Sequence, residues 1–247
     1  KYQMEIFFDF ETTGTDIARD SITQFTFMKN ETSEYFGSLV NPKQPISSEA
    51  VKITGITNAD VERYPPFGHF IPKILDFIGD EPVYLIAHNG DRFDKLLLIR
   101  FLQENGYSMP STWKFIDTLK LSRIRYPLEK SHRMDNLRER FNLSTKNNHS
   151  ANKDVFDLAI IYKGLKQNDS SKTLHELSLH YVSFGKYKGS DFRTVPKSYI
   201  DYLIQNQVYL YQEDVFCYLQ STSQIPKKRK LYRKLSWSKN EQQRKHM

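Results

Sequence analysis

The sequence predicts an α/β fold in which a mixed sheet of five strands is flanked by helices. Segments with strand character first follow one another along the chain, at 4–10, 22–28 and 33–42. Later strand segments, at 82–90 and 112–121, are separated by stretches with helical periodicity. Strands that run consecutively and then alternate with helices are typical of a layered α/β protein.

Each strand is predicted from its own pattern. MEIFFDF is a short apolar and aromatic run that the turn-like TTGTD ends, and ITQFTFM alternates between apolar and polar residues. SEYFGSLVNP is stopped by Pro42. PVYLIAHNG is a continuous apolar run, as expected of a strand buried on both faces. TWKFIDTLKL is the fifth strand.

The helices are predicted from apolar spacing and end signals. Two short helical turns surround Gly55, with Asn58 as the N-cap of the second. A longer helix follows Asp91, which we expect to be its N-cap residue, and Gly106 suits its C-cap. The remaining helices are expected at 134–143, at 152–166 and over most of the C-terminal extension.

The positive charge is concentrated at one end of the chain. The formal net charge is +7, yet residues 226–247 carry nine basic side chains and one acidic side chain. The other 225 residues therefore have a net charge of −1. We divide the chain into a main domain of residues 1–168, a small extension of residues 169–225, and a basic tail of residues 226–247 that we expect to be disordered.

Composition excludes several classes of protein. No apolar run approaches the roughly 20 residues that span a bilayer, so we expect no membrane partner. The single cysteine, Cys217, excludes an intrachain disulfide and a cysteine-based zinc site, and favours an intracellular, cytoplasmic protein. The cluster PKKRK at 226–230 makes nuclear import the alternative for a eukaryotic or viral source.

Acidic residues follow the predicted strands. Asp9 and Glu11 are two apart at the end of a buried strand, so both carboxylates point to the same side. Like charges held together recruit a cation, and divalent cations with oxygen ligands compensate them well. Asp94 follows the fourth strand, and His149 precedes Asp154 by five positions at the start of a helix. Each motif alone is also compatible with a solvated turn or a surface acid.

Taken together, these motifs resemble the DEDDh 3′–5′ exonuclease superfamily, of the proofreading epsilon-subunit type with a ribonuclease H-like fold. The resemblance covers about residues 4–165 and rests on FFDFETTGT (7–15), AHNGDRFD (87–94) and HSANKD (149–154). NPKQPISSEAVKITGIT is similar to a family segment that ends in His-Gly-Ile, with Thr54 in place of the histidine. FIDTLKLSR resembles the family's Asp-Thr-Leu strand. The spacing from His149 to Asp154 separates this class from the sister class with Tyr-x3-Asp.

The resemblance implies a set of site residues. It implies two divalent metal ions, Mg²⁺ or Mn²⁺, with Asp9 contacting both, Glu11 and Asp154 completing the shell of one, and Asp94 holding the second. His149 would be the general base. The catalytic residues it implies are Asp9, Glu11, Asp94, His149 and Asp154. The residues it places around the terminal nucleotide are Thr12, Thr13, Gly14, Thr15 and Asn89.

The implied function is a metal-dependent 3′–5′ exonuclease that releases nucleoside monophosphates from DNA 3′ ends, single-stranded ends first. The alternatives are an exoribonuclease that trims RNA and a degenerate nucleic-acid-binding module. Residues 184–204 resemble the C-terminal segment of stand-alone members of the exonuclease X type. There Tyr187 and Phe192 are candidates for base stacking, and the extension is the candidate surface for a homodimer or another protein partner.

Overall fold

The computed structural model describes residues 4–145, 150–208, 215, 216, 218, 219, 222 and 224. The chain divides into two compact units, Lys1–His175 and Glu176–Met247. Three predictions fall on residues outside those described: the role of His149, the disorder of the tail 226–247, and its PKKRK cluster. The domain limits at residues 168 and 225 stay predictions.

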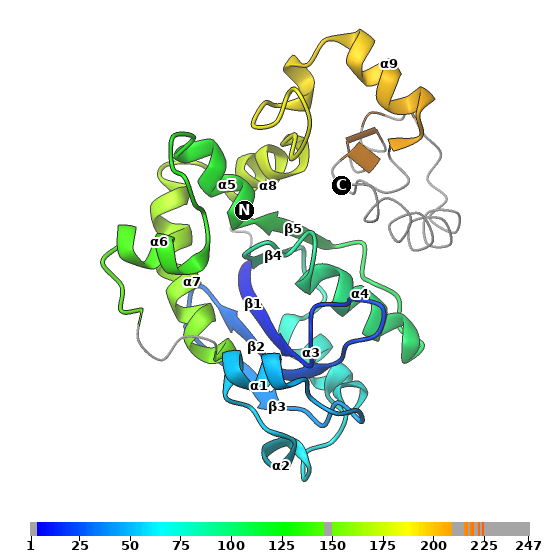
Figure 1. The fold of residues 1–247 in the computed structure, drawn as a ribbon, viewed down its shortest axis with the longest axis vertical. Coiled ribbons are helices and arrows are strands. Elements are labelled where there is room, and N and C mark those ends of the chain that lie inside the picture. The colour runs from blue at the N-terminus through cyan, green and yellow to red at the C-terminus, as the bar shows by residue number, and fades with distance from the viewer. Residues whose placement is uncertain are drawn as a thin grey trace. The chain divides into compact units, whose positions relative to one another are not determined.

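The first unit is built on one mixed sheet of five strands, which confirms the predicted fold class (Figure 1). The strands lie in the order β3-β2-β1-β4-β5, with β1 antiparallel to β2, β2 antiparallel to β3, and β4 and β5 parallel to β1. The strands are β1 (Met4–Thr12), β2 (Ile22–Lys29), β3 (Tyr35–Leu39), β4 (Val83–Ala87) and β5 (Trp113–Asp117).

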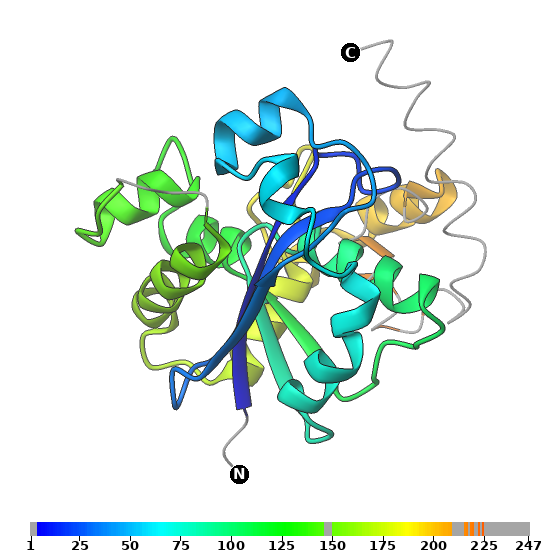
Figure 2. The ribbon, with the colours of Figure 1, turned by 90° about the horizontal axis from the view of Figure 1, so that it is seen from below.

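Helices cover both faces of this sheet (Figure 2). Ile6, Phe8 and Phe10 of β1 point into a buried core with α3 (Ile71–Ile78) and α4 (Asp94–Glu104). The opposite face of β1 lies against α7 (Ala151–Lys166), where the ring of Phe7 contacts Tyr162 at 5.4 Å between centroids. The alternation of a strand therefore gives β1 an apolar face toward α3 and α4, and a face with carboxylates toward α7.

The other helices agree broadly with the sequence. In the described part of the chain, no helix is long and apolar enough to cross a bilayer. The remaining helical elements are α1 (Ser48–Thr54), α2 (Asn58–Val61), η1 (Phe67–Phe70), α5 (Thr118–Arg125), α6 (Met134–Arg140), α8 (Ser171–His180), η2 (Phe192–Thr194) and α9 (Lys197–Gln205).

The predicted end of the fifth strand and the predicted N-cap of α2 were wrong. The fifth strand ends at Asp117, because its carboxylate accepts the N–H of Leu119 at 2.9 Å and thereby caps α5. The N-cap of α2 is Thr57, which forms a capping box with Asp60. The side chain of Asn58 instead accepts the N–H of Ile46 at 3.0 Å and joins α2 to the preceding loop.

The second unit has its own apolar core. Its buried residues include Phe192, which is only 1% exposed and stacks on Tyr218 with 4.8 Å between ring centroids. The prediction that Phe192 stacks on bases is therefore wrong, since a ring with no exposed face cannot receive one.

A buried glutamate joins β1 to the end of α7. Glu5 is 4% exposed and accepts hydrogen bonds from Tyr162 (2.7 Å), Lys166 (2.6 Å), Ser171 (2.5 Å) and Asn30 (2.6 Å). Burial raises the pKa of Glu5, but the bonds from Lys166 and its neighbours lower it more, so it lies below the usual range. The charged form of Glu5 is therefore the form that stabilises the fold.

We expect Glu5→Gln to lower the free energy of unfolding by about 2–4 kcal/mol at pH 7, because it removes one partner of a buried ion pair. Because the pKa of Glu5 is lower in the folded state, the difference should shrink as the pH falls below the unfolded value near 4.5. Urea unfolding at several pH values measures it. Glu34→Gln, whose side chain is 59% exposed beside Lys29, is the control and should change stability by less than about 1 kcal/mol. Equal losses in both variants would contradict the assignment.

Candidate active site

The candidate site begins where the sheet opens beside β1. Parallel pairing between β1 and β4 ends at Phe7 and Ile86, whereas β1 continues to Thr12. Phe10 lies beyond the last pair, and its N–H donates to the Asp94 carboxylate at 3.2 Å. Asp94, at the start of α4, therefore accepts the backbone hydrogen bond for which β4 offers no partner.

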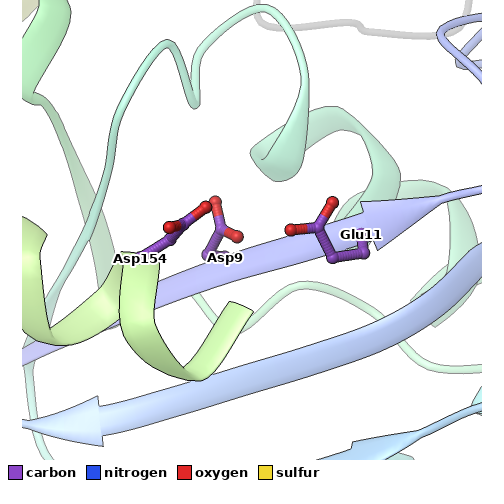
Figure 3. A group of neighbouring side chains, drawn as sticks. All are labelled: Asp9, Glu11 and Asp154. Atoms are coloured by element: carbon purple, nitrogen blue, oxygen red, sulfur yellow. The ribbon is translucent and has the colours of Figure 1, made fainter. Parts of the chain in front are cut away.

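Two further carboxylates project from β1 on its α7 face. Asp9 and Glu11 alternate with Phe8 and Phe10, so they point to the same side, as predicted. Figure 3 shows them side by side with Asp154. One ligand oxygen from each of these three residues lies within 4.8 Å of the others.

Strand β2 fixes the position of Asp154. The N–H of Ala151, the first residue of α7, donates to the side chain of Gln24 at 3.0 Å, and Thr26 bonds to Asn152. These hydrogen bonds place the first turn of α7 against the end of β1. The partial positive charge of a helix N-terminus then faces the carboxylates of Asp9 and Glu11.

The carboxylates resist ionisation. Burial raises the pKa of Asp9 well above its usual range, and the charges of the neighbouring carboxylates raise it further. Burial and the charge of Asp154 raise the pKa of Glu11 to about 7, and burial raises the pKa of Asp94 to about 7. Oxygen donors gathered in this way fit a hard divalent cation, whose charge would favour their ionised forms.

Arg138 is a functional candidate that the sequence analysis missed. It is 1% exposed and donates to Asp154 (2.5 Å), Asp157 (2.7 Å) and Asp135 (2.9 Å). The guanidinium of Arg138, which lies on α6, thus donates to one oxygen of Asp154. In the sequence, Arg138 lies within residues 120–146, a stretch with a net charge of +5 that suggests a solvated face or a phosphate contact.

The turn that carries Asp94 is held by a buried charge network. Asn89 has φ +61° and its N–H donates to Asp117 at 2.9 Å. Asp91 bonds to Lys95 at 3.2 Å and to Lys120 at 2.6 Å, so it pairs with lysines and does not cap α4. Burial raises the pKa of Asp91, but the two lysines lower it well below its usual range. The network leaves Asp94 as the acid directed at β1.

The segment after β1 is a compact turn. Thr13 is 1% exposed, donates to Asp20 at 2.8 Å and accepts from Gln44 at 2.8 Å. A Cβ at Gly14 would lie only 2.5 Å from the Asp20 carboxylate, so a side chain there would displace Asp20 from its bond with Thr13. The hydroxyl of Thr12 donates to the Gly14 carbonyl at 2.6 Å.

Thr15 is exposed, whereas the hydroxyls of Thr12 and Thr13 are already engaged within the protein. The nucleotide contacts of Thr12, Thr13, Gly14, Thr15 and Asn89 stay predictions.

Comparison with known proteins identifies the family. Residues 6–162 match the family model described as Exonuclease (RNase_T). The chain is 30% identical over 186 residues to the PolC-type DNA polymerase III of Listeria welshimeri, and 29% identical over 213 residues to that of Streptococcus pyogenes serotype M1. These alignments cover 74% and 82% of this chain but 12% and 14% of those polymerases. The chain therefore spans a small part of the length of these relatives.

Two solved structures share the fold. Exonuclease I superposes with a TM-score of 0.61 at 21% identity, over 70% of this chain and 42% of that chain. Exonuclease X in complex with 5′ overhanging duplex DNA gives a TM-score of 0.56 at 21% identity, over 70% of this chain and 99% of that chain. The mixed sheet flanked by helices is thus the ribonuclease H-like fold of nucleases. The chain itself belongs to the exonuclease family.

In metal-free protein, we expect Glu11→Gln to raise the free energy of unfolding at pH 8 by about 1–3 kcal/mol. Burial and Asp154 raise the folded-state pKa of Glu11 from 4.5 to about 7. The loss of stability caused by ionised Glu11 therefore grows as the pH rises from 4.5 to about 7, and it is absent below pH 4.5. Urea unfolding in EDTA measures it. Glu49→Gln, at an exposed position of α1, should have no such pH-dependent effect.

Divalent cations should raise the melting temperature of the parent protein and raise it less in Glu11→Gln, because binding to the folded state alone stabilises it. A Glu11→Gln variant less stable than its parent at pH 8 in EDTA would contradict this description of the site.

We expect Arg138→Met to lower the free energy of unfolding of the metal-free protein by about 3–5 kcal/mol, because buried carboxylates lose their shared cation. Asp135→Asn removes the partner that is 54% exposed and should cost less than about 1 kcal/mol. Chemical denaturation of both variants measures the difference. A decrease under about 1 kcal/mol in Arg138→Met would show that the ion pairs contribute little.

Proposed function

We propose that this protein is a 3′–5′ exonuclease of the DEDDh type that hydrolyses DNA from its 3′ end and releases nucleoside monophosphates. The observation that carries the proposal is the convergence of Asp9, Glu11 and Asp154, with ligand oxygens within 4.8 Å, beside Asp94. Asp9 and Glu11 lie near the end of β1, Asp94 lies at the start of α4, and Asp154 lies in the first turn of α7. The three segments follow one another along the chain in the same order as the family's motifs.

The carboxylates would hold divalent cations, Mg²⁺ or Mn²⁺. Asp9, Glu11 and Asp154 would bind one cation, and Asp94, beside β1, would help to bind a second. When bound, the cations supply an activated water nucleophile and neutralise the charge that develops on the leaving 3′ oxygen. Arg138 donates to one oxygen of Asp154 and so holds this carboxylate at the start of α7.

His149 takes the proton from the attacking water. It precedes α7 by two residues, close in sequence to Asp154. An imidazole with an ordinary pKa near 6.5 is mostly neutral at physiological pH, as a general base must be.

The substrate we propose is a DNA 3′ end, with single-stranded DNA preferred. Exonuclease X was solved with 5′ overhanging duplex DNA, and exonuclease I with a dT13 oligonucleotide. RNA is the alternative substrate. A nucleic-acid-binding module without activity is disfavoured, because binding alone has no use for Asp9, Glu11, Asp94 and Asp154 gathered in one buried site.

Digestion of 5′-labelled oligonucleotides tests the proposal. With Mg²⁺, labelled single-stranded DNA should shorten stepwise from its 3′ end, and EDTA should abolish the reaction. Asp9→Asn should lower the rate by about 10³-fold or more, because cation binding supplies several kcal/mol to the transition state. Asp76→Asn, an exposed acid on α3, is the matched control and should leave the rate unchanged.

The other outcomes decide between the alternatives. Early release of a labelled mononucleotide would show the opposite polarity, and faster degradation of RNA than of DNA would favour the exoribonuclease. Equal rates for Asp9→Asn and Asp76→Asn would remove Asp9 from the active site.

A further inference from the structure

The second unit carries a row of tyrosine rings with lysines at one end. Tyr187 contacts Tyr199 at 4.8 Å between ring centroids, and Tyr199 stacks on Tyr202 at 5.9 Å with an interplanar angle of 18°. The Lys186 ammonium lies 5.4 Å from the centre of the Tyr187 ring. Lys188 follows in the same loop and is exposed, like Lys186. We call these five residues the tyrosine row.

The scaffold beneath fixes the tyrosine row. Ile200 and Leu203 of α9 are 5% and 1% exposed in the core of this unit, so Tyr199 and Tyr202 lie on the flank of the helix. Gly185 has φ +66°, and a Cβ there would lie 2.6 Å from the Tyr199 hydroxyl. The loop therefore closes tightly onto Tyr199, which limits the freedom of the ring.

The outer end of the row is open. Tyr202 is 53% exposed, which is high for a large ring held in a stack. A planar ring that is held in place and half exposed can accept another planar group, and nucleic-acid bases stack on such rings.

The charge near the row is positive. Between residues 184 and 202 the basic side chains are Lys186, Lys188, Arg193 and Lys197, and the acidic ones are Asp191 and Asp201, a net charge of +2. Asp191 pairs with Arg193 at 2.5 Å. Within the described residues of this unit, no ion pair engages Lys186 or Lys188. Exposed ammonium groups at these positions can bind an anion beside the rings.

We propose that the tyrosine row binds single-stranded DNA, with a base stacked on Tyr202 and phosphates bound by Lys186 and Lys188. The tyrosine row lies outside residues 6–162, which match the exonuclease family. Rings with exposed ammonium groups fit a polyanion whose bases are unpaired better than an apolar protein surface. The proposal rests on the proposed function only in choosing DNA as the nucleic acid.

The test uses the full chain with Asp9→Asn, in EDTA, so that labelled oligo(dT) is bound but not degraded. Tyr202→Ala should weaken binding about five- to tenfold in fluorescence anisotropy, because one base no longer stacks. Tyr202→Phe keeps the ring and should bind like its parent. Tyr35→Ala, at a tyrosine in the first unit that is 54% exposed, is the matched control and should not weaken binding.

The lysines are tested through the salt dependence of binding. Lys186→Gln with Lys188→Gln should reduce the slope of log K against log salt concentration by about 1.4, which is about 0.7 for each phosphate that is no longer neutralised. Lys73→Gln with Lys163→Gln, at two exposed lysines of the first unit, is the control pair and should leave the slope unchanged.

Several outcomes would overturn the proposal. One is equal affinity for Tyr202→Ala and Tyr35→Ala, and another is an equal decrease in affinity for Tyr202→Phe and Tyr202→Ala. Tighter binding of oligo(rU) than of oligo(dT) would reject DNA as the ligand. Self-association that disappears in Tyr202→Ala without a change in DNA binding would make a second copy of this chain the occupant. Binding without metal does not require catalysis, so an inactive parent enzyme would refute the proposed function and leave this test valid.

Discussion

The packing of β1 against α7 is the interaction on which the rest of the site depends. One face of β1 meets the helix along its length, with Glu5 bonded to Tyr162 and Lys166 near one end and Asp9 beside Asp154 near the other. A buried ion pair is intolerant of displacement, because a shift would leave a charge without its partner. The pairing at Glu5 therefore helps to set the register that brings the first turn of α7 to the carboxylates.

That register brings the carboxylates of Asp9, Glu11 and Asp154 together, and the surrounding structure must offset the repulsion between them. Arg138 supplies one buried cation to Asp154, and the start of α7 supplies a partial positive charge. These do not suffice, since the pKa values of Glu11 and Asp94 remain near 7. Burial, together with the repulsion between carboxylates, therefore favours a bound cation at this site. The aromatic core on the opposite face of β1 stabilises the strand independently of this charge.

The parts that followed from the sequence are those set by local chain geometry. The common direction of Asp9 and Glu11 follows from the two-residue period of a strand, and the helix before residue 166 from its apolar spacing. Arg138 could not be found in this way, because its partners Asp154 and Asp157 are reached only when α6 packs on α7. Asp91 was misassigned for the same reason. Its spacing suits an N-cap, but Lys120, 29 positions away, holds its carboxylate.

The place of the site in the sheet has a physical reason as well. Parallel strands that separate leave backbone N–H groups without partners, and a buried N–H must find an acceptor. The separation of β1 from β4 beyond Phe7 creates this need at Phe10, and the carboxylate of Asp94 meets it. A neutral amide could accept the same bond, but it could not also attract a cation. The acid at this position thus joins the termination of the sheet to the chemistry of the site. Burial raises the pKa of Asp94, and the hydrogen bond from Phe10 offsets part of that rise.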